Sequence, residues 1–257
     1  MRKKNSPDDN RLLAALSADV QARLLPHLEC RQLPLGGVVY ESGATLQAAE
    51  FPTDCIVSLL YCMENGESGE IAVIGNEGMV GISLFMGGNS TSSRAIVQSA
   101  GTAYQLPARL LLEEFERNGE MMWLMLRYAQ SLITQMTQTA ACNRHHSIDE
   151  QLARWLLLSL DRLSGETMTM KPQLIANMLS ITTARVAEVA GRLERLGVIA
   201  YHKGRIKVID RPTLEKLSCE CYRVVKQETD RLLPPVISAG SKSFRVPAAK
   251  PVTHMRT

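Results

Sequence analysis

The stretch KPQLIANMLSITTARVAEVAGRLERLGVIAYHKGRIKVID, residues 171–210, combines two short helical patterns with a β-hairpin pattern. Pro172 suits the first turn of a helix, and apolar residues then recur at helical spacing until Ser180 and Ile181 break the period. Thr182 is a candidate N-cap of a second helix, which Gly197 closes. Two short helices joined by a tight turn form a helix-turn-helix, and the hairpin pattern that follows makes it a winged helix-turn-helix.

Positive charge is concentrated in the same part of the chain. Residues 171–211 hold eight lysines and arginines against three acidic residues, whereas the whole chain carries a net charge of only +3. A cationic module of this kind attracts the phosphates of nucleic acid, whose neutralisation releases counterions. The sequence therefore predicts that this module binds double-stranded DNA. The alternative is the solvated surface of a small helical domain.

The preceding chain changes character near residue 110. Residues 12–28 predict a short entry helix with Ser17 as its candidate N-cap. From about residue 29 to residue 107, short apolar segments alternate with turn pairs that contain Gly or Asn, which is typical of a compact antiparallel β domain. From Met121 to about Ala141 the chain has no Gly or Pro, which predicts one long helix.

The long helix carries two apolar rows, so it needs two packing partners. We expect one row to pack on the β domain and the other to meet the same helix of a second copy in a parallel homodimer. A single helix buried inside a monomer is the alternative. The predicted dimer interface consists of Met121, Met125, Tyr128, Leu132, Gln135 and Met136. The neighbouring row consists of Met122, Leu126, Ala129, Ile133, Met136 and Ala140.

This order of elements resembles the Crp/Fnr family of bacterial transcription regulators over about residues 20–211. The motifs that carry the resemblance are Ala176-x-x-Leu179, Thr182-x-x-x-Val186 and Leu193-x-x-Leu196-Gly197, with Gly204 in the wing. The segments CNRHHSIDEQLARWLLL and DRPTLEKLSCECYRVVKQETDRLL are similar to one branch of the family. The resemblance implies an α+β fold with an N-terminal double-stranded β-roll of the cyclic nucleotide-binding type, a long dimerisation helix and a C-terminal winged helix-turn-helix.

We expect six segments along the chain. They are a polar segment with the entry helix at residues 1–19, the β-roll at 20–117, the dimerisation helix at 118–142, the winged helix-turn-helix at 143–211, a C-terminal helix at 212–233 and a disordered tail at 234–257. The amino terminus lacks the apolar segment of a secretion signal, and no apolar run is long enough to cross a bilayer. The sequence therefore predicts a cytoplasmic protein with no membrane contact.

The resemblance implies that the helix starting at Thr182 enters the major groove of a two-fold operator. Thr183, Ala184 and Glu188 would face base edges, with Arg185 beside them. Members of the family commonly contact base edges with an Arg-Glu-Arg set. This chain departs from that set, so we expect a different operator preference. An ion pair with Arg192 is the alternative role of Glu188. The full predicted DNA-binding set is Lys171, Gln173, Thr182, Thr183, Ala184, Arg185, Glu188, Arg192, Lys203 and Arg205. RNA polymerase is a further partner that the resemblance suggests.

The stretch EGMVGISLFMGGNSTSSRA, residues 77–95, lies where related regulators hold a cyclic nucleotide. Their cassette resembles Phe-Gly-Glu followed by Arg-Ser-Ala, but this chain reads Val80-Gly81-Ile82 and Ser93-Arg94-Ala95. The carboxylate for the ribose is missing, and Arg94 is shifted by one place, which turns a strand residue to the other face. We expect a degenerate pocket that cyclic AMP does not control, either an empty scaffold or a site for an unknown small-molecule effector. Its predicted residues are Gly81, Ile82, Ser92, Ser93 and Arg94.

Catalytic, cofactor and metal sites are not expected. The chain has no nucleophile elbow, paired-carboxylate signature or Walker loop, so an enzyme is not predicted. The spacing of the six cysteines shows no ligand cluster, and the set that would hold an amino-terminal iron–sulfur cluster is absent.

The histidines and the carboxy-terminal cysteines leave an alternative open. His145 and His146 lie four residues before Asp149 and Glu150, which predicts hinge hydrogen bonds. On a helix, Cys219 and Cys221 would point to different sides, with Cys221 in the core. Two other functions remain: a cyclic-nucleotide-binding module, or a redox- or metal-responsive sensor of the same fold that uses Cys142, Cys219 and Cys221 or the histidine pair.

Overall fold

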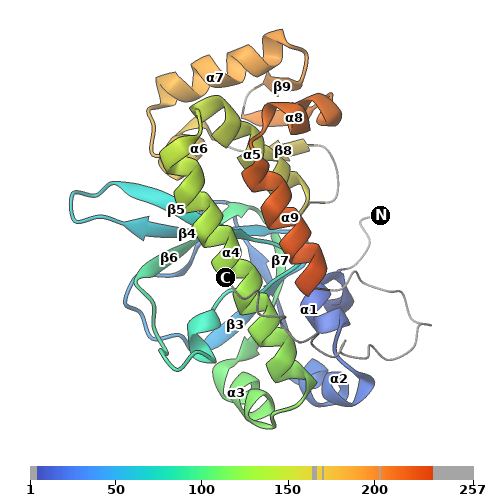
Figure 1. Cartoon of the computed structure of the whole chain (residues 1–257). Helices are drawn as coiled ribbons and strands as arrows, with labels where there is room; N and C mark the ends of the chain where they lie inside the picture. Colours follow the sequence, from blue (N-terminus) through green and yellow to red (C-terminus); the bar gives the residue numbers. More distant parts are fainter. Residues whose placement is uncertain (1–4, 164–166, 170, 203, 234–257) are drawn as a thin grey trace, which may run out of the picture.

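The computed structural model describes residues 5–163, 167–169, 171–202 and 204–233, and it shows an α+β chain. A β domain lies beside one long helix, and a smaller helical domain with its own sheet lies at one end (Figure 1). The predicted tail at 234–257 and Lys203 fall outside the described residues. In the part of the chain that is described, no helix combines the length and the apolar character needed to span a bilayer.

The amino-terminal segment forms short helices rather than one. They are η1 (Pro7–Asp9), α1 (Arg11–Ala14), α2 (Ala18–Leu24) and η2 (Leu25–His27). Asn10 caps α1, since its side chain accepts from the backbone N–H groups of Leu12 and Leu13. The same side chain donates to the carbonyls of Pro52 and Gly78, both at 2.8 Å, so this cap also ties the segment to the β domain.

Two antiparallel sheets form the β domain, as the sequence predicts. One sheet has the order β1-β7-β3, with β1 (Glu29–Leu33), β7 (Gly101–Pro107) and β3 (Ala48–Pro52). The other has the order β2-β6-β4-β5, with β2 (Val38–Tyr40), β6 (Ser93–Ser99), β4 (Ile56–Cys62) and β5 (Ser68–Ile74). Alternating residues of both sheets, among them Phe51, Val57 and Leu106, form a common apolar core.

The long helix α4 (Glu120–His145) follows α3 (Ala108–Glu116) and packs on the β domain. Gln135 exchanges two hydrogen bonds with the backbone of Val73 on β5, at 2.9 and 3.0 Å. Tyr128 donates its hydroxyl to the carbonyl of Met79, and a Cβ at Gly78 would lie only 2.5 Å from its ring, so this position requires glycine. These contacts fix one face of α4 against its own chain.

The structure therefore corrects the predicted dimer interface. Five of its six residues are buried against the chain itself, and the sixth is partly buried in the same core: Met121, Met125, Tyr128, Leu132, Gln135 and Met136. The helix also runs to His145, three residues beyond the predicted end at 142. Of the neighbouring row, Leu126, Ile133 and Ala140 are exposed, whereas Ala129 is buried and Met122 and Met136 are partly buried.

The carboxy-terminal domain is a winged helix-turn-helix, as the sequence predicts. After α5 (Ile148–Leu160) come β8 (Thr167–Thr169), α6 (Pro172–Met178), α7 (Thr183–Arg195), β9 (Ile199–His202) and β10 (Arg205–Val208). The wing is a three-stranded sheet of order β8-β10-β9, one strand more than expected. The predicted single terminal helix is two helices, α8 (Arg211–Leu217) and α9 (Glu220–Leu232), and α9 lies along α4 (Figure 1).

A chain of buried polar side chains joins the β domain to α5. The Ser58 hydroxyl lies 2.6 Å from a carboxyl oxygen of Glu70 and 2.7 Å from the amide oxygen of Gln98. Gln98 in turn donates to Ser159 on α5 at 2.9 Å. One hydroxyl proton cannot serve two acceptors, but a protonated Glu70 can donate to Ser58 and free that proton for Gln98. Burial, opposed by Ser58 and by Arg154, raises the pKa of Glu70 to about 7.

We expect the Glu70→Gln variant to gain stability relative to the parent chain as the pH rises. The pKa of Glu70 is about 7 in the fold against an ordinary 4.5, so its protonated form stabilises the fold fully below pH 4.5, and this stabilisation is lost as the pH rises through 7. The pKa shift corresponds to about 3 kcal/mol of unfolding free energy that the parent chain loses as the pH rises. Gln does not titrate, so the variant does not lose this contribution. Urea unfolding of both proteins at about pH 5 and about pH 8 measures the difference. Glu116→Gln, on an exposed glutamate of α3, is the control and should show no such trend. A pH-independent difference between the parent chain and Glu70→Gln would contradict the assignment.

Candidate nucleic-acid interface and effector cavity

The second helix of the helix-turn-helix, α7, presents a polar face to solvent. The side chain of Thr182 accepts from the backbone N–H of Arg185 and caps the helix, as its sequence position predicts. Val186, Val189 and Leu193 are buried in the domain core, which fixes the rotation of α7 about its axis. The opposite face is exposed and contains four of the predicted DNA-reading residues, Thr183, Ala184, Arg185 and Glu188.

The turn before α7 is strained in a way that glycine would relieve. Ser180 has a φ of 52°, in the left-handed region that favours glycine. Its hydroxyl donates to the carbonyl of Ser68 at 3.2 Å, at the start of β5. The helix-turn-helix thus contacts the β4–β5 hairpin of the β domain directly.

Two arginines of α7, Arg185 and Arg192, form ion pairs of different kinds. Arg192 makes a two-pronged contact with Asp149 on α5, at 2.6 and 2.7 Å, and donates to Glu188 at 2.7 Å. Hydrogen bonds from Arg192 lower the pKa of Asp149, and those from Arg185 and Arg192 lower the pKa of Glu188. The alternative role of Glu188, an ion pair with Arg192, is therefore present. Arg192 holds α7 to α5, whereas the ion pair of Arg185 with Glu188 lies within α7 and is exposed.

The predicted phosphate contacts lie on other elements of the same domain. Lys171 is the residue before α6 and is exposed, and Gln173 is exposed on the first turn of α6. Arg205 is exposed at the start of β10, and Lys207 on the same strand is also exposed. Lys207 was not in the predicted set, although alternation along the strand could have indicated it.

A cavity of about 220 Å³ opens in the β domain next to α4. Four of the five predicted effector residues line it, namely Gly81, Ile82, Ser92 and Ser93. Arg94 does not, because its side chain pairs with Glu41 at 2.8 Å. Hydroxyl groups gather on one wall, where Ser93 lies 3.0 Å from Thr91 and 3.3 Å from Tyr40. Among the described residues, no charged side chain lines this cavity.

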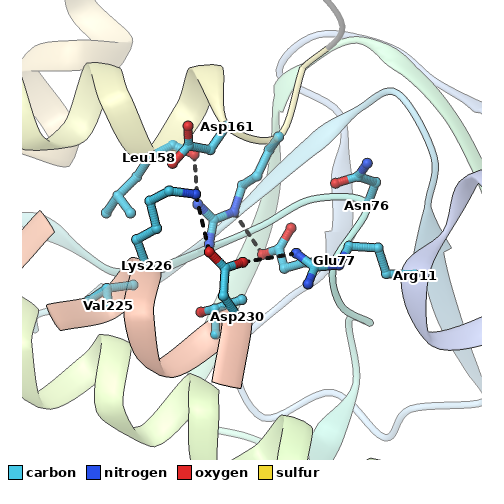
Figure 2. Close-up of a pocket in the computed structure, with 10 residues that line it drawn as sticks. Arg11, Asn76, Glu77, Leu158, Asp161, Val225, Lys226 and Asp230 are labelled. Carbon is cyan, nitrogen blue, oxygen red and sulfur yellow. Dashed lines mark hydrogen bonds and ion pairs between the residues drawn. The ribbon is translucent and has the colours of Figure 1, made fainter. Parts of the chain in front are cut away.

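A second cavity, of about 100 Å³, lies where the amino-terminal segment, the β domain, α5 and α9 meet (Figure 2). Ion pairs form its walls. Arg162 contacts Glu77 at 2.7 Å with both side chains buried, and it also donates to the carbonyl of Leu158 at 2.6 Å. Arg11 lies 3.7 Å from Asp230 and donates to the carbonyl of Leu233. These ion pairs and hydrogen bonds join the four elements, so we interpret this cavity as a structural junction, although Nε of Arg11 is buried without a hydrogen-bond partner.

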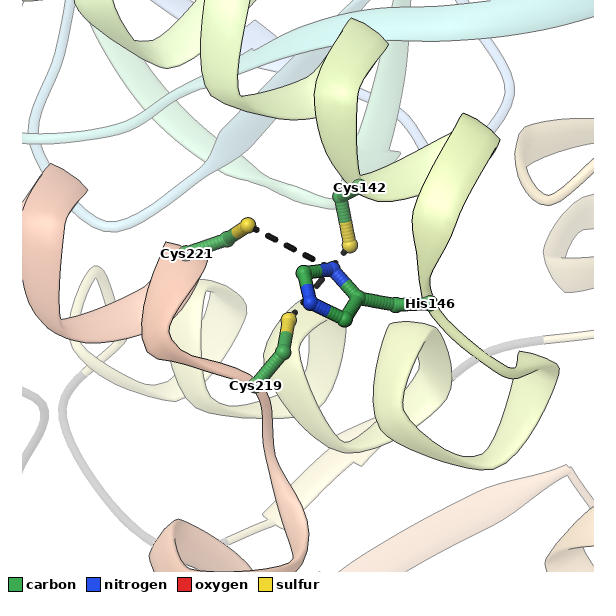
Figure 3. A group of neighbouring side chains, drawn as sticks. All are labelled: Cys142, His146, Cys219 and Cys221. Atoms are coloured by element: carbon green, nitrogen blue, oxygen red, sulfur yellow. Dashed lines mark hydrogen bonds between the residues drawn. The ribbon is translucent and has the colours of Figure 1, made fainter.

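The histidines and the carboxy-terminal cysteines lie differently from the sequence expectation. Asp149 pairs with Arg192, and Glu150 caps α5 through Ser147, so the expected hinge hydrogen bonds do not form among the described residues. His146 instead lies among the thiols of Cys142, Cys219 and Cys221 (Figure 3). Cys219 and Cys221 converge because Cys219 is the extended N-cap residue of α9 and is not inside the helix.

Residues 150–217 match the family model described as a Crp-like helix-turn-helix domain. No curated protein matches the sequence. Among solved structures, the chain is similar to FixK2 from Bradyrhizobium japonicum, with a TM-score of 0.64 and 12% identity over 75% of this chain and 98% of that one.

Two further structures show the same likeness. TTHB099, a transcriptional regulator of the CRP family from Thermus thermophilus, has a TM-score of 0.62 and 16% identity, over 73% of this chain and 96% of that one. CLP, a c-di-GMP responsive global regulator from Xanthomonas campestris, has a TM-score of 0.58 and 14% identity, over 75% of this chain and 99% of that one.

The chain has the fold of the Crp/Fnr regulators and carries their helix-turn-helix domain, which confirms the resemblance seen in its sequence. TTHB099 and CLP are both described as regulators.

Proposed function

We propose that this chain is a homodimeric transcription regulator that binds a two-fold DNA operator through α7. The observation that carries the proposal is the exposed face of α7 in a domain that matches the Crp-like helix-turn-helix. Its first turns bear a hydroxyl at Thr183, a methyl at Ala184 and a guanidinium at Arg185, which can contact base edges in a major groove. Lys171, Gln173, Lys203 and Arg205 serve as phosphate contacts in this proposal.

We assign dimerisation to a further row of α4, which is exposed along its whole length. Trp123, Leu126 and Ile133 expose 58%, 43% and 49% of their surface, which is unusual for large apolar residues on one helix face. Successive exposed positions of this row are three and four residues apart, which is the spacing of a two-helix seam. The row consists of Trp123, Leu126, Gln130, Ile133, Thr137 and Ala140.

For the effector, we propose that the β-domain cavity does not take a cyclic nucleotide. A cyclic phosphate needs a cation or an array of donors, and Arg94 is engaged by Glu41 outside the cavity. Apolar walls with Tyr40, Thr91 and Ser93 on one side suit a small uncharged molecule with hydrogen-bonding groups. A contact with RNA polymerase stays a prediction.

The test is a DNA-binding measurement on the full chain. After selection of a preferred duplex, the affinity should fall steeply with added salt, because phosphate contacts release counterions. Arg185→Ala should weaken binding to that duplex about tenfold and change the preferred sequence at one position per half-site. Arg109→Ala is the matched control, because Arg109 is an exposed, ion-paired arginine on α3 in the β domain. Absence of salt-dependent binding, or equal effects of the two variants, would falsify the proposal.

A further inference from the structure

Four potential metal ligands meet where the end of α4 faces the start of α9. Cys142 lies on the last turns of α4 and His146 is its C-cap residue, four positions later. Cys219 is the N-cap of α9 and Cys221 lies on its first turn. One ligand atom from each of the four residues lies within 4.8 Å of all the others (Figure 3).

The size of the cluster fits a single tetrahedral ion. The Sγ atoms of Cys142 and Cys219 are 3.5 Å apart, and Sγ of Cys221 lies 3.6 Å from Nδ1 of His146. With Zn–S bonds of about 2.3 Å and Zn–N bonds of about 2.0 Å, a tetrahedral site has edges of about 3.8 Å between sulfurs and about 3.5 Å between sulfur and nitrogen. A four-iron cluster spreads its ligands around several metal atoms and needs a wider set.

The second nitrogen of the imidazole is already oriented for ligation. Nε2 of His146 lies 3.3 Å from a carboxylate oxygen of Glu220. A proton on Nε2 that is held by this carboxylate leaves the lone pair of Nδ1 directed at the thiols. A carboxylate behind a metal-binding histidine is the usual support of such ligands.

The surrounding charge also suits a bound divalent ion. Three thiolates and one divalent cation carry a net charge of −1, which is costly to bury alone. Arg154 on α5 is only 4% exposed, and its positive charge acts on both Cys142 and Cys221. This buried guanidinium offsets the residual negative charge of the site.

We propose that Cys142, His146, Cys219 and Cys221 form a structural zinc site that fastens α9 to the end of α4. Three soft sulfur ligands and one imidazole favour Zn²⁺, and a full set of four protein ligands leaves no open coordination position. The site lies at the junction of α4 and α5, so it holds the hinge between the β domain and the DNA-binding domain. It replaces the expectation from the sequence that the chain holds no metal.

The experiment measures the metal content of the full-length protein purified without chelators. Elemental analysis should give one zinc per chain, and Cys219→Ser, Cys221→Ser and His146→Ala should each lose it. Cys30→Ser and Cys62→Ser are matched controls, because these cysteines are exposed and lie outside the cluster, and both should keep the zinc. A parent protein without stoichiometric metal, or with iron in its place, overturns the proposal. So does a Cys219→Ser protein that retains zinc.

A second measurement uses only the parent protein, so it tests the site even if the variants fail to fold. Adding Co²⁺ to metal-free parent protein should produce the visible bands of a tetrahedral ion together with thiolate charge-transfer absorption, and Zn²⁺ should displace them. An octahedral cobalt spectrum, or a Cys142–Cys219 disulfide in the metal-free protein prepared under reducing conditions, would contradict the site. These readouts do not depend on DNA, so their failure is distinguishable from failure of the proposed function.

Discussion

Replacing Leu126 and Ile133 together by aspartate is expected to convert the proposed dimer into a monomer. Both side chains lie on the exposed row of α4, and in a two-helix seam each would face the same row of the second copy. Four carboxylates placed in that seam would lose their water and repel one another. Because a two-fold operator is bound by two linked reading helices, the monomer should lose about 100-fold or more in affinity for it.

Sedimentation and DNA titration of the same samples measure this effect. Leu25→Asp with Met86→Asp is the matched control, because it places the same charges on two other exposed apolar residues, in η2 and in the β domain. The control should remain dimeric and bind DNA as the parent chain does. A double variant of α4 that still sediments as a dimer would show that another surface forms the interface.

The second large effect is expected from the buried ion pair between Arg162 and Glu77. Their side chains are 6% and 9% exposed, and the pair joins the winged helix-turn-helix domain to the β domain. Arg162→Met removes the cation but leaves the Glu77 carboxylate buried without its partner. Breaking a buried pair in this way costs about 3–5 kcal/mol of unfolding free energy.

Urea unfolding with a double-mutant cycle tests this expectation. The Glu77→Gln and Arg162→Met double variant should recover a large part of the loss, because it leaves no unpaired charge. Arg109→Met, which breaks the exposed pair with Glu113, should cost less than about 1 kcal/mol. Equal losses from Arg162→Met and Arg109→Met would mean that the buried pair contributes no more than an exposed one.

Structural elements that are determined by residues close together in the sequence could be predicted from it. Thr182 marked the start of α7 because an N-cap and its helix lie within one turn, and the two rows of α4 were visible as a period. Which row faces the β domain was not predictable, because both rows are rich in apolar residues and the choice depends on the sheet that packs there. The contact of Gln135 with Val73 decides it, and those residues are far apart in the sequence.

The cysteine cluster was missed for a related reason. Cys142-x-x-x-His146 and Cys219-x-Cys221 are separated by more than seventy residues, and neither pair is a ligand set alone. The sequence suggested that Cys219 belongs to a helix, where its thiol would diverge from that of Cys221. The break between α8 and α9 places Cys219 in an extended conformation, and only the fold brings it to α4.

The contact of Arg192 with Asp149 has a consequence for how such a protein could respond to a signal. Because two hydrogen bonds fasten α7 to α5, a rotation of the chain at Ser147, where α5 begins, would carry α7 as a rigid body. The surface that faces the bases would keep its shape, and only the separation of the two copies of α7 would change. Grooves on one side of B-DNA recur about every 34 Å, so that separation decides whether both helices fit at once. A signal would then alter the distance between the two copies of α7 and leave the conformation of each copy unchanged.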